Sequence, residues 1–241
     1  MIAVESGHPK GTVGVAQGEL ARYTDFDISL DSLYVPVGTT ITRVKGPSVS
    51  RNRNTLALEY FQGEWLFFVD DDQVLRRDTL LRLLAHNVDI VGALYSTKHP
   101  PFIPTVFKDE LEPGKLYRHA FWSALGASRG LTPCVAVGTG AMLVRRRVFE
   151  TIPKPWFHWG QGESDDVFFC RKAREHGFKI HVDTNAVVGH ASTNVIWPDL
   201  DDPPGVAIQM NWLAVKLPND DDEAAAEHVF DQTLGREGEP Q

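Results

Sequence analysis

The chain has 241 residues, of which 42% are hydrophobic and 23% charged, and it carries a formal net charge of −8. That length suits one large domain or two small ones with an ordinary hydrophobic core. The sequence has no apolar run of about 18 residues and no basic-then-apolar segment near its start, which argues against a membrane span and a secretory signal.

Strand and helix patterns alternate along the chain. Short β-branched apolar runs predict strands over 12–16, 32–37, 40–44, 65–69, 89–95, 135–144 and 179–182. Amphipathic stretches predict helices over 48–62, 78–86 and 164–176, the last with Ser164 as N-cap and Gly177 just after its end. This alternation indicates an α/β fold, a three-layer α/β/α sandwich with a mostly parallel central sheet.

Three segments depart from this alternation. Residues 98–133 are rich in proline and isolated aromatic residues, and we expect an excursion with an antiparallel hairpin over one side of the sheet. Residues 192–217 resemble a flexible extension with Trp197 and Trp212 as anchors. Residues 218–241 hold eight acids and one base, so this tail has a net charge of −7 and residues 1–217 total only −1. We expect the tail to be disordered or a frayed helix.

Three carboxylates, Asp70, Asp71 and Asp72, follow the apolar strand 65–69 directly. Ligands of open α/β sheets bind at the carboxyl ends of strands. Alternate residues of an extended segment point the same way, so Asp70 and Asp72 can converge on a hard cation such as Mg²⁺ or Mn²⁺. Two other interpretations stay open, an acidic loop capping the next helix and the nucleophile loop of a haloacid-dehalogenase-type phosphatase.

A second acidic pair, Asp165 and Asp166, falls in the first turn of the predicted helix 164–176. The helix macrodipole favours ionised carboxylates there, as a general base requires at neutral pH. Ordinary helix-start chemistry is the alternative. His190 follows a strand and a glycine, and it is either a structural histidine or a metal ligand.

Several of these stretches together resemble one family. GEWLFFVDDD (63–72) is similar to the Gly-Glu-aromatic-x-x-Phe-x-Asp-x-Asp signature of GT-A-fold glycosyltransferases, especially glycosyltransferase family 2 and small phage-encoded relatives. SRNRNTLALEY (50–60) resembles the family's Arg-Asn helix, and VGTGAMLVRRRVFE (137–150) its glycine-rich strand. GESDDVFFCRKAREHGF (162–178) resembles the helix with the catalytic acidic pair, and VVGH (187–190) the end that carries a metal-binding histidine.

The resemblance implies a Rossmann-like GT-A catalytic domain over 1–198, with a donor half near 1–97 and an acceptor half near 98–198, followed by an extension over 199–217. It implies metal-dependent, inverting transfer of a hexose from a nucleotide-diphosphate sugar, UDP being expected, to an acceptor hydroxyl. The metal, Mn²⁺ or Mg²⁺, would lie on Asp70, Asp72 and His190. The donor would contact Ala16, Gln17, Gly18, Glu19, Arg53, Asp70 and Asp71.

Catalysis would fall to Asp166 as general base, with Asp165 orienting the acceptor. The family pair is usually Glu-Asp, whereas here it is Asp-Asp, so the base stays open between these two residues and Glu163. The acceptor would contact Gly140, Trp156, Trp159 and Glu163.

The acceptor half has its own charge pattern. Residues 113–162 carry seven Lys and Arg against one Glu, a net charge of +6, with tryptophans and histidines between them. Such a mixture favours a polyanionic, base-bearing acceptor, although a solvated strand edge gives the same pattern. With the phage-encoded relatives, this points to hydroxymethylated pyrimidines in DNA. A glycan or small-molecule acceptor, a phosphatase or nucleotidyltransferase using the same aspartates, and a non-catalytic binding module are the alternatives.

The two cysteines indicate the redox environment in which the protein works. Cys134 and Cys170 are far apart and lack metal-ligand spacing, so we expect reduced thiols in a cytoplasmic protein without a membrane partner. The sequence leaves the oligomeric state open.

Overall fold

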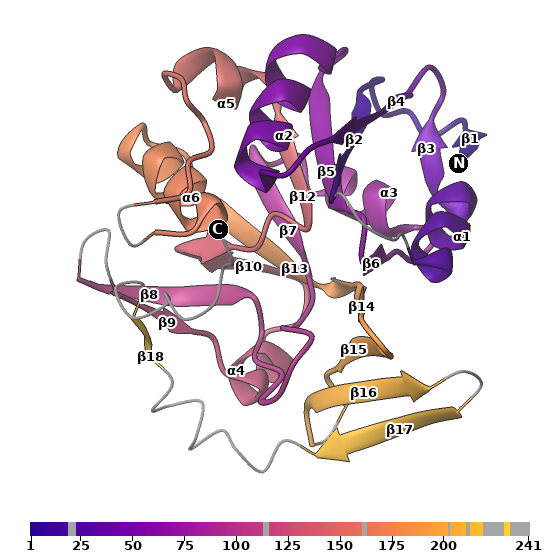
Figure 1. Ribbon diagram of the computed structural model, residues 1–241, viewed down its shortest axis with the longest axis vertical. Helices are drawn as coiled ribbons and strands as arrows, with labels where there is room; N and C mark the ends of the chain where they lie inside the picture. The colour runs from indigo at the N-terminus through magenta and orange to yellow at the C-terminus, as the bar shows by residue number, and fades with distance from the viewer. Residues whose placement is uncertain are drawn as a thin grey trace.

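A seven-stranded sheet forms the centre of the molecule, seen in a computed structural model that describes residues 1–18, 23–112, 116–160, 163–201, 203–210, 213–218 and 229–231 (Figure 1). The strand order is β10-β13-β7-β12-β5-β2-β4. The strands are β2 (Thr12–Gln17), β4 (Thr40–Lys45), β5 (Trp65–Asp70), β7 (Ile90–Leu94), β10 (Leu131–Cys134), β12 (Ala141–Arg145) and β13 (Ile180–Val187).

Most strands of this sheet run in one direction. β2 is parallel to both β4 and β5, and β13 is parallel to β7. β12 is antiparallel to both β5 and β7, so these two neighbours also share a direction, whereas β10 is antiparallel to β13. Five of the seven strands therefore point the same way, and the prediction of a mostly parallel central sheet is confirmed.

Helices cover both faces of the sheet, because β5 is apolar on both sides. Leu66 and Phe68 belong to one core cluster, and Trp65, Phe67 and Val69 belong to the other. Figure 1 shows α2, α5 and α6 on one side and α1 and α3 on the other. The helices are α1 (Thr24–Ser32), α2 (Val49–Thr55), α3 (Thr79–Ala85), α4 (Trp122–Ala127), α5 (Arg146–Thr151) and α6 (Asp165–Glu175). The predicted three-layer α/β/α sandwich is confirmed.

The helix expected over 48–62 is present, but it changes from an α-helix to a π-helix along its length. α2 continues into a π-helical turn, η1 (Leu56–Tyr60), which buries Leu56 and Ala57 but leaves Tyr60 exposed. The last predicted helix is α6, with Ser164 as N-cap and Gly177 at a positive φ just after its end. Helices α1, α4 and α5 were not predicted, because their apolar residues are too few for a clear 3.6-residue period.

The apolar run 135–144 was expected as one strand but forms two. β11 (Ala136–Val137) pairs with β8 (Val106–Glu112) in a separate sheet, and β12 pairs with β5. The break falls at Gly138 and Gly140, where a Cβ would lie 2.1 and 2.9 Å from the Tyr95 hydroxyl. The chain thus changes sheets where it passes tightly over Tyr95.

The proline-rich excursion contains the antiparallel hairpin expected from the sequence. β8 (Val106–Glu112) pairs with β9 (Leu116–His119), and their sheet has the order β11-β8-β9-β18. β18 (Val229–Asp231) is the described part of the acidic tail beyond residue 218, and the expectations for the rest of the tail lie outside the described residues. A short parallel pair, β1 (Ile2–Val4) and β3 (Tyr34–Pro36), completes the N-terminal part.

The segment expected to be a flexible extension is a β-structure instead. β6 (Gln73–Val74), β14 (Gly189–Ala191), β15 (Val195–Asp199), β16 (Gly205–Met210) and β17 (Leu213–Pro218) form a five-stranded sheet. Trp197 anchors it, since its Nε1 donates to Gln209 Oε1 at 2.9 Å, whereas Trp212 lies outside the described residues. The expected boundary at residue 198 falls inside β15. Of the helices described, none is long and apolar enough to span a bilayer.

Candidate active site

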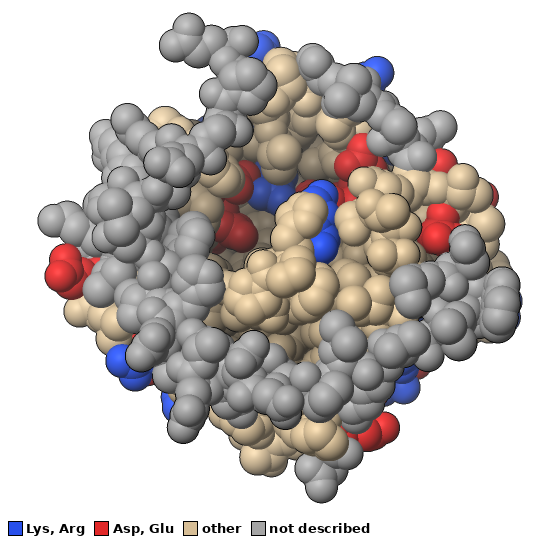
Figure 2. All heavy atoms as spheres, turned by 60° about the horizontal axis from the view of Figure 1, so that its bottom comes forward, with Lys and Arg blue, Asp and Glu red and all other residues tan. Residues whose placement is uncertain are grey.

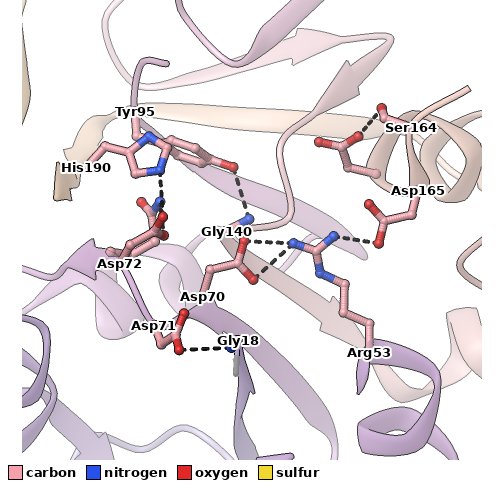
Figure 3. Close-up of polar contacts among 12 residues, drawn as sticks. Gly18, Arg53, Asp70, Asp71, Asp72, Tyr95, Gly140, Ser164, Asp165 and His190 are labelled. Atoms are coloured by element: carbon pink, nitrogen blue, oxygen red, sulfur yellow. Dashed lines mark hydrogen bonds and ion pairs between the residues drawn. The ribbon is translucent and has the colours of Figure 1, made fainter. Parts of the chain in front are cut away.

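The acidic run lies where β5 ends and the chain turns into the second sheet. The Asp70 amide donates to the Gly140 carbonyl at 2.9 Å, which ties the end of β5 to the start of β12. β6 follows at once and pairs with β14, so Gln73 lies opposite His190. This pairing brings His190 beside the acidic run (Figure 3), across 118 residues of chain.

Asp72 contacts two basic side chains through one carboxylate oxygen. Its Oδ2 lies 2.8 Å from Lys98 Nζ and 3.2 Å from His190 Nε2. His190 Nδ1 lies 2.7 Å from the Ser96 carbonyl, which only accepts, so Nδ1 carries a proton and Nε2 faces Asp72. Burial raises the pKa of Asp72, but the hydrogen bonds and charges of His190 and Lys98 outweigh it and hold the pKa well below its usual range.

A buried arginine joins the two acidic pairs. Arg53, on α2, donates through Nη2 to both carboxylate oxygens of Asp70 at 3.0 and 2.8 Å. Its Nη1 donates to Asp165 Oδ2 at 2.7 Å. Arg53 is 4% and Asp165 2% exposed, so both are enclosed by the fold. Arg53, which the resemblance places at the nucleotide, holds the two carboxylates in place (Figure 3).

The electrostatics of Asp70 follow from this enclosure. Burial raises the pKa of Asp70 to about 6, and the nearby charges of Asp72 and Asp165 add to the rise. Arg53 opposes the shift without cancelling it. Burial alone would lower the pKa of Arg53, but the surrounding aspartates raise it above its usual value, so the guanidinium stays charged.

Asp166 occupies a different environment from its neighbour. It is partly exposed, and its Oδ1 accepts hydrogen bonds from the Ser164 hydroxyl and, at 2.8 Å, from the Val167 amide. Burial and the adjacent charge of Asp165 raise the pKa of Asp166, while Ser164 and Arg53 oppose that rise. Asp165 is therefore committed to Arg53, and Asp166 is the more accessible carboxylate of the pair.

The expected nucleotide contacts lie along the end of β2. Ala16 pairs with Asp70 across the sheet, and the Gln17 carbonyl accepts from Asn52 Nδ2 at 3.0 Å. The Gly18 amide donates to Asp71 Oδ2 at 3.0 Å. Ala16, Gln17, Gly18 and Asp71 therefore lie at one edge, next to Asp70. Glu19 lies outside the described residues.

The expected acceptor contacts separate into two groups. The backbone of Gly140 is used within the fold, since its amide donates to the Tyr95 hydroxyl at 3.0 Å. Trp156 is buried against Phe149 and donates to the Ile152 carbonyl. Glu163 is buried too, and it accepts both arms of Arg171 at 2.9 and 2.8 Å.

Trp159 forms the second group, because it is 62% exposed. It lines a groove of about 480 Å³ between α2 and the loop that precedes α6. Arg51, Lys154 and His158 line the same groove, and its described lining contains no acidic residue. The other lining residues are Ser48, Ser50, Asn54, Leu58, Pro155, Trp156 and Phe157.

The basic stretch 113–162 does not form one surface. Arg145 pairs with Trp65 at the beginning of β5, the opposite end of the strand from Asp70. Arg147 forms an ion pair with Asp89, and Arg146 lies 4.2 Å over the Phe61 ring. These three arginines therefore lie away from the carboxylates, and of the described Lys and Arg residues in this stretch only Lys154 lines the groove.

The predicted metal ligands are only partly assembled. Across the described part of the chain, no three His, Cys, Asp or Glu side chains are grouped to hold a metal ion, because Asp70 turns to Arg53. Asp72 and His190 do fit a divalent cation, since one offers a carboxylate oxygen and the other a ring nitrogen oriented by Ser96. Mg²⁺ and Mn²⁺ commonly take their remaining ligands from water and substrate phosphates.

Two residues of the site were missed from the sequence. Lys98 contacts Asp72, and the Tyr95 ring packs edge-on against His190 with 5.5 Å between centroids. Both lie at or just after the end of the predicted strand 89–95, where a parallel sheet places its ligand-binding residues. Figure 2 shows a hollow on this face with basic and acidic atoms inside it.

Comparison with known proteins gives both a family and a fold. The sequence profile of a family described as glycosyltransferase like family 2 matches residues 30–199. The structure is similar to A197 from STIV, with 16% identity, a TM-score of 0.53, and 86% of this chain and 97% of that chain covered.

Two further solved structures resemble it less. The inositol-1-phosphate CTP transferase from T. maritima has 12% identity and a TM-score of 0.43, with 71% of this chain and 84% of that chain covered. GalNAc-T7 with UDP, GalNAc and Mn²⁺ has 14% identity and a TM-score of 0.49, with 74% of this chain and 43% of that chain covered. A comparison with curated protein sequences finds no match. The family match and the likeness to A197 confirm the predicted fold class.

Proposed function

The chain belongs to the glycosyltransferase like family 2, and we propose that it moves a hexose from a nucleotide-diphosphate sugar to an acceptor hydroxyl, with inversion at the anomeric carbon. The observation that carries this proposal is the linkage of two acidic groups by Arg53. Asp70 lies next to Asp72 and His190, while Asp165 lies next to Asp166. A donor site and a base are thereby held in one rigid frame.

The donor would lie along the ends of β2 and β5. Asp71 and Gly18 form the part of this edge suited to the nucleoside of a UDP-sugar, with Ala16 and Gln17 beneath it. Asp72 and His190 would hold Mn²⁺ or Mg²⁺, which when bound neutralises the diphosphate and makes it a better leaving group. Asp70 acts indirectly, because both of its oxygens accept from Arg53.

Asp166 would be the general base. Its Oδ1 is occupied by Ser164 and the Val167 amide, and Oδ2 would take the proton of the attacking hydroxyl. Its raised pKa makes it a stronger base than an ordinary aspartate once it is deprotonated. Attack from the face opposite the diphosphate inverts the anomeric carbon in a single displacement.

The groove beside Trp159 would receive the acceptor. Arg51, Lys154 and His158 favour an anionic group, and the exposed indole offers a stacking plane for a base. A hydroxymethylated pyrimidine in DNA has the required hydroxyl, ring and phosphates. The clustered arginines 145–147 do not support this assignment, because they lie at the other end of β5.

Binding of the donor is the direct test of this proposal. Thermal unfolding should be measured with a panel of nucleotide-diphosphate sugars, each with Mn²⁺ and with EDTA. We expect one class of donor to raise the Tm and Mn²⁺ to enlarge the rise. The same shifts in Asp72→Asn as in the unaltered protein would contradict the site, and no shift with any donor would contradict the function.

A further inference from the structure

Lys98 contacts the carboxylate oxygen that the proposed cation would need. Its ammonium lies 2.8 Å from Asp72 Oδ2, the oxygen that also faces His190 Nε2 at 3.2 Å. The Lys98 side chain is 35% exposed, so its head lies at the border between the site and solvent. Two cations on one oxygen repel strongly, and a divalent ion on Asp72 and His190 therefore requires Lys98 to move.

Hydrogen bonds hold the backbone around Lys98 in place, and the side chain extends from it to Asp72. The Thr97 amide donates to the Ile103 carbonyl at 2.8 Å, and the Ile103 amide donates to the Thr97 hydroxyl at 3.1 Å. Trp122 Nε1 donates to the Phe102 carbonyl at 3.1 Å, which ties the same loop to α4. The loop therefore keeps the Lys98 backbone beside the site, and a flexible four-carbon stem lets the ammonium change partners.

The surrounding charges limit where the displaced ammonium can go. The neighbouring side chains Asp70 and Asp71 are carboxylates, and Asp70 already holds Arg53. A diphosphate brought to Asp72 would be the strongest anion within reach of this ammonium.

We propose that Lys98 is a diphosphate-binding residue of the donor site, held on Asp72 until a cation and the donor replace it there. The inference rests on the proposed donor class, and it assigns to Lys98 two opposite effects. Lys98 opposes binding of the cation alone, because it occupies the cation's ligand. It favours binding of the diphosphate, because it supplies a positive charge and up to three donors.

The first measurement is the binding of Mn²⁺ alone to the full chain. The electron paramagnetic resonance signal of free Mn²⁺ reports how much of the ion stays unbound. Lys98→Met should bind Mn²⁺ about five- to tenfold more tightly than the unaltered protein. Lys10→Met is the matched control, since Lys10 is exposed near the beginning of β2, far from Asp72, and its loss changes the net charge equally. Equal affinities in the Lys98 and Lys10 variants would overturn the inference.

The second measurement is calorimetric binding of UDP in EDTA. Lys98→Met should weaken UDP binding about five- to tenfold, whereas Lys98→Arg and Lys10→Met should retain it. Unchanged UDP affinity in Lys98→Met would also overturn the inference while leaving the proposed function standing. If neither the unaltered protein nor its variants bind UDP or another nucleoside diphosphate, in EDTA or with Mn²⁺, the proposed function and the inference both fail.

Discussion

Arg53 Nη1 donates to Asp165 Oδ2 at 2.7 Å, although the two residues are separated by 112 positions in the chain. Both side chains are almost fully buried, and the same guanidinium also holds Asp70. The contact joins the helix α2 on one side of β5 to the start of α6, so the two acidic groups cannot move independently.

Removing Arg53 should therefore destabilise the protein. Arg53→Met leaves Asp70 and Asp165 without their counter-ion in a buried site, which costs about 3–5 kcal/mol of the free energy of unfolding. Urea denaturation of both proteins measures this loss of unfolding free energy. Arg51→Met, on the exposed side of the same helix, should change stability by no more than about 0.5 kcal/mol. Similar losses in the two variants would show that Arg53 does not hold the site together.

The pH dependence of turnover separates the roles of Asp165 and Asp166. A base must be deprotonated, so activity falls as the pH drops through its pKa, and the raised pKa of Asp166 places this fall above that of an ordinary aspartate. Asp165→Asn removes a neighbouring negative charge, lowers the pKa of Asp166, and should move the acid limb of kcat/KM to lower pH. A complete loss of turnover at every pH in Asp165→Asn would instead make Asp165 the base.

The sequence predicted the parts of the site that follow from local pattern. The apolar strand ending in Asp70, Asp71 and Asp72 was evident, because such a strand must be buried and its end must be solvated. The position of Asp165 and Asp166 at a helix start was evident from capping and period. His190 lies beside the acidic run because β6 pairs with β14, and the sequence did not predict that pairing.

The rest depended on contacts between distant segments. The partners of Arg53 and Lys98 are set by how the loops and helices pack, and no periodicity encodes a pair 112 residues apart. The burial of Trp156 and Glu163 had the same origin, since aromatic and acidic residues in a loop look exposed until their partners are known. The five-stranded sheet that contains His190 was missed because its strands are short and separated by Pro and Asp.

Trp159 should contribute to acceptor binding and not to donor binding. With an oligonucleotide containing hydroxymethylcytosine as acceptor, Trp159→Ala should raise its KM about 5- to 150-fold, because base stacking is worth about 1–3 kcal/mol. The Kd for UDP should stay unchanged. Tyr60→Ala, which removes an exposed aromatic residue outside the groove, is the control. An unchanged KM would exclude the groove as the acceptor site.

Gly138 should tolerate no side chain. A Cβ there would lie 2.1 Å from the Tyr95 hydroxyl and 3.2 Å from Thr105 Cβ, so Gly138→Ala should cost about 1–3 kcal/mol of unfolding free energy. Gly18→Ala is the comparison, because the nearest atom to its Cβ is 4.0 Å away. Calorimetric unfolding of both variants measures the difference, and a fully stable Gly138→Ala protein would show that the loop over Tyr95 is not tightly packed.

Release of nucleoside diphosphate from a nucleotide sugar is the decisive measure of metal-dependent sugar transfer at Asp72. This release should be measured with Mn²⁺ and with EDTA in the unaltered protein, in Asp72→Asn and in His86→Gln. His86→Gln is the control, because it removes a His–Asp contact elsewhere in the fold, the one between His86 and Asp183. We expect Mn²⁺-dependent release in the unaltered protein and in His86→Gln, and none in Asp72→Asn. Equal release in Asp72→Asn, or release that persists in EDTA, would contradict it.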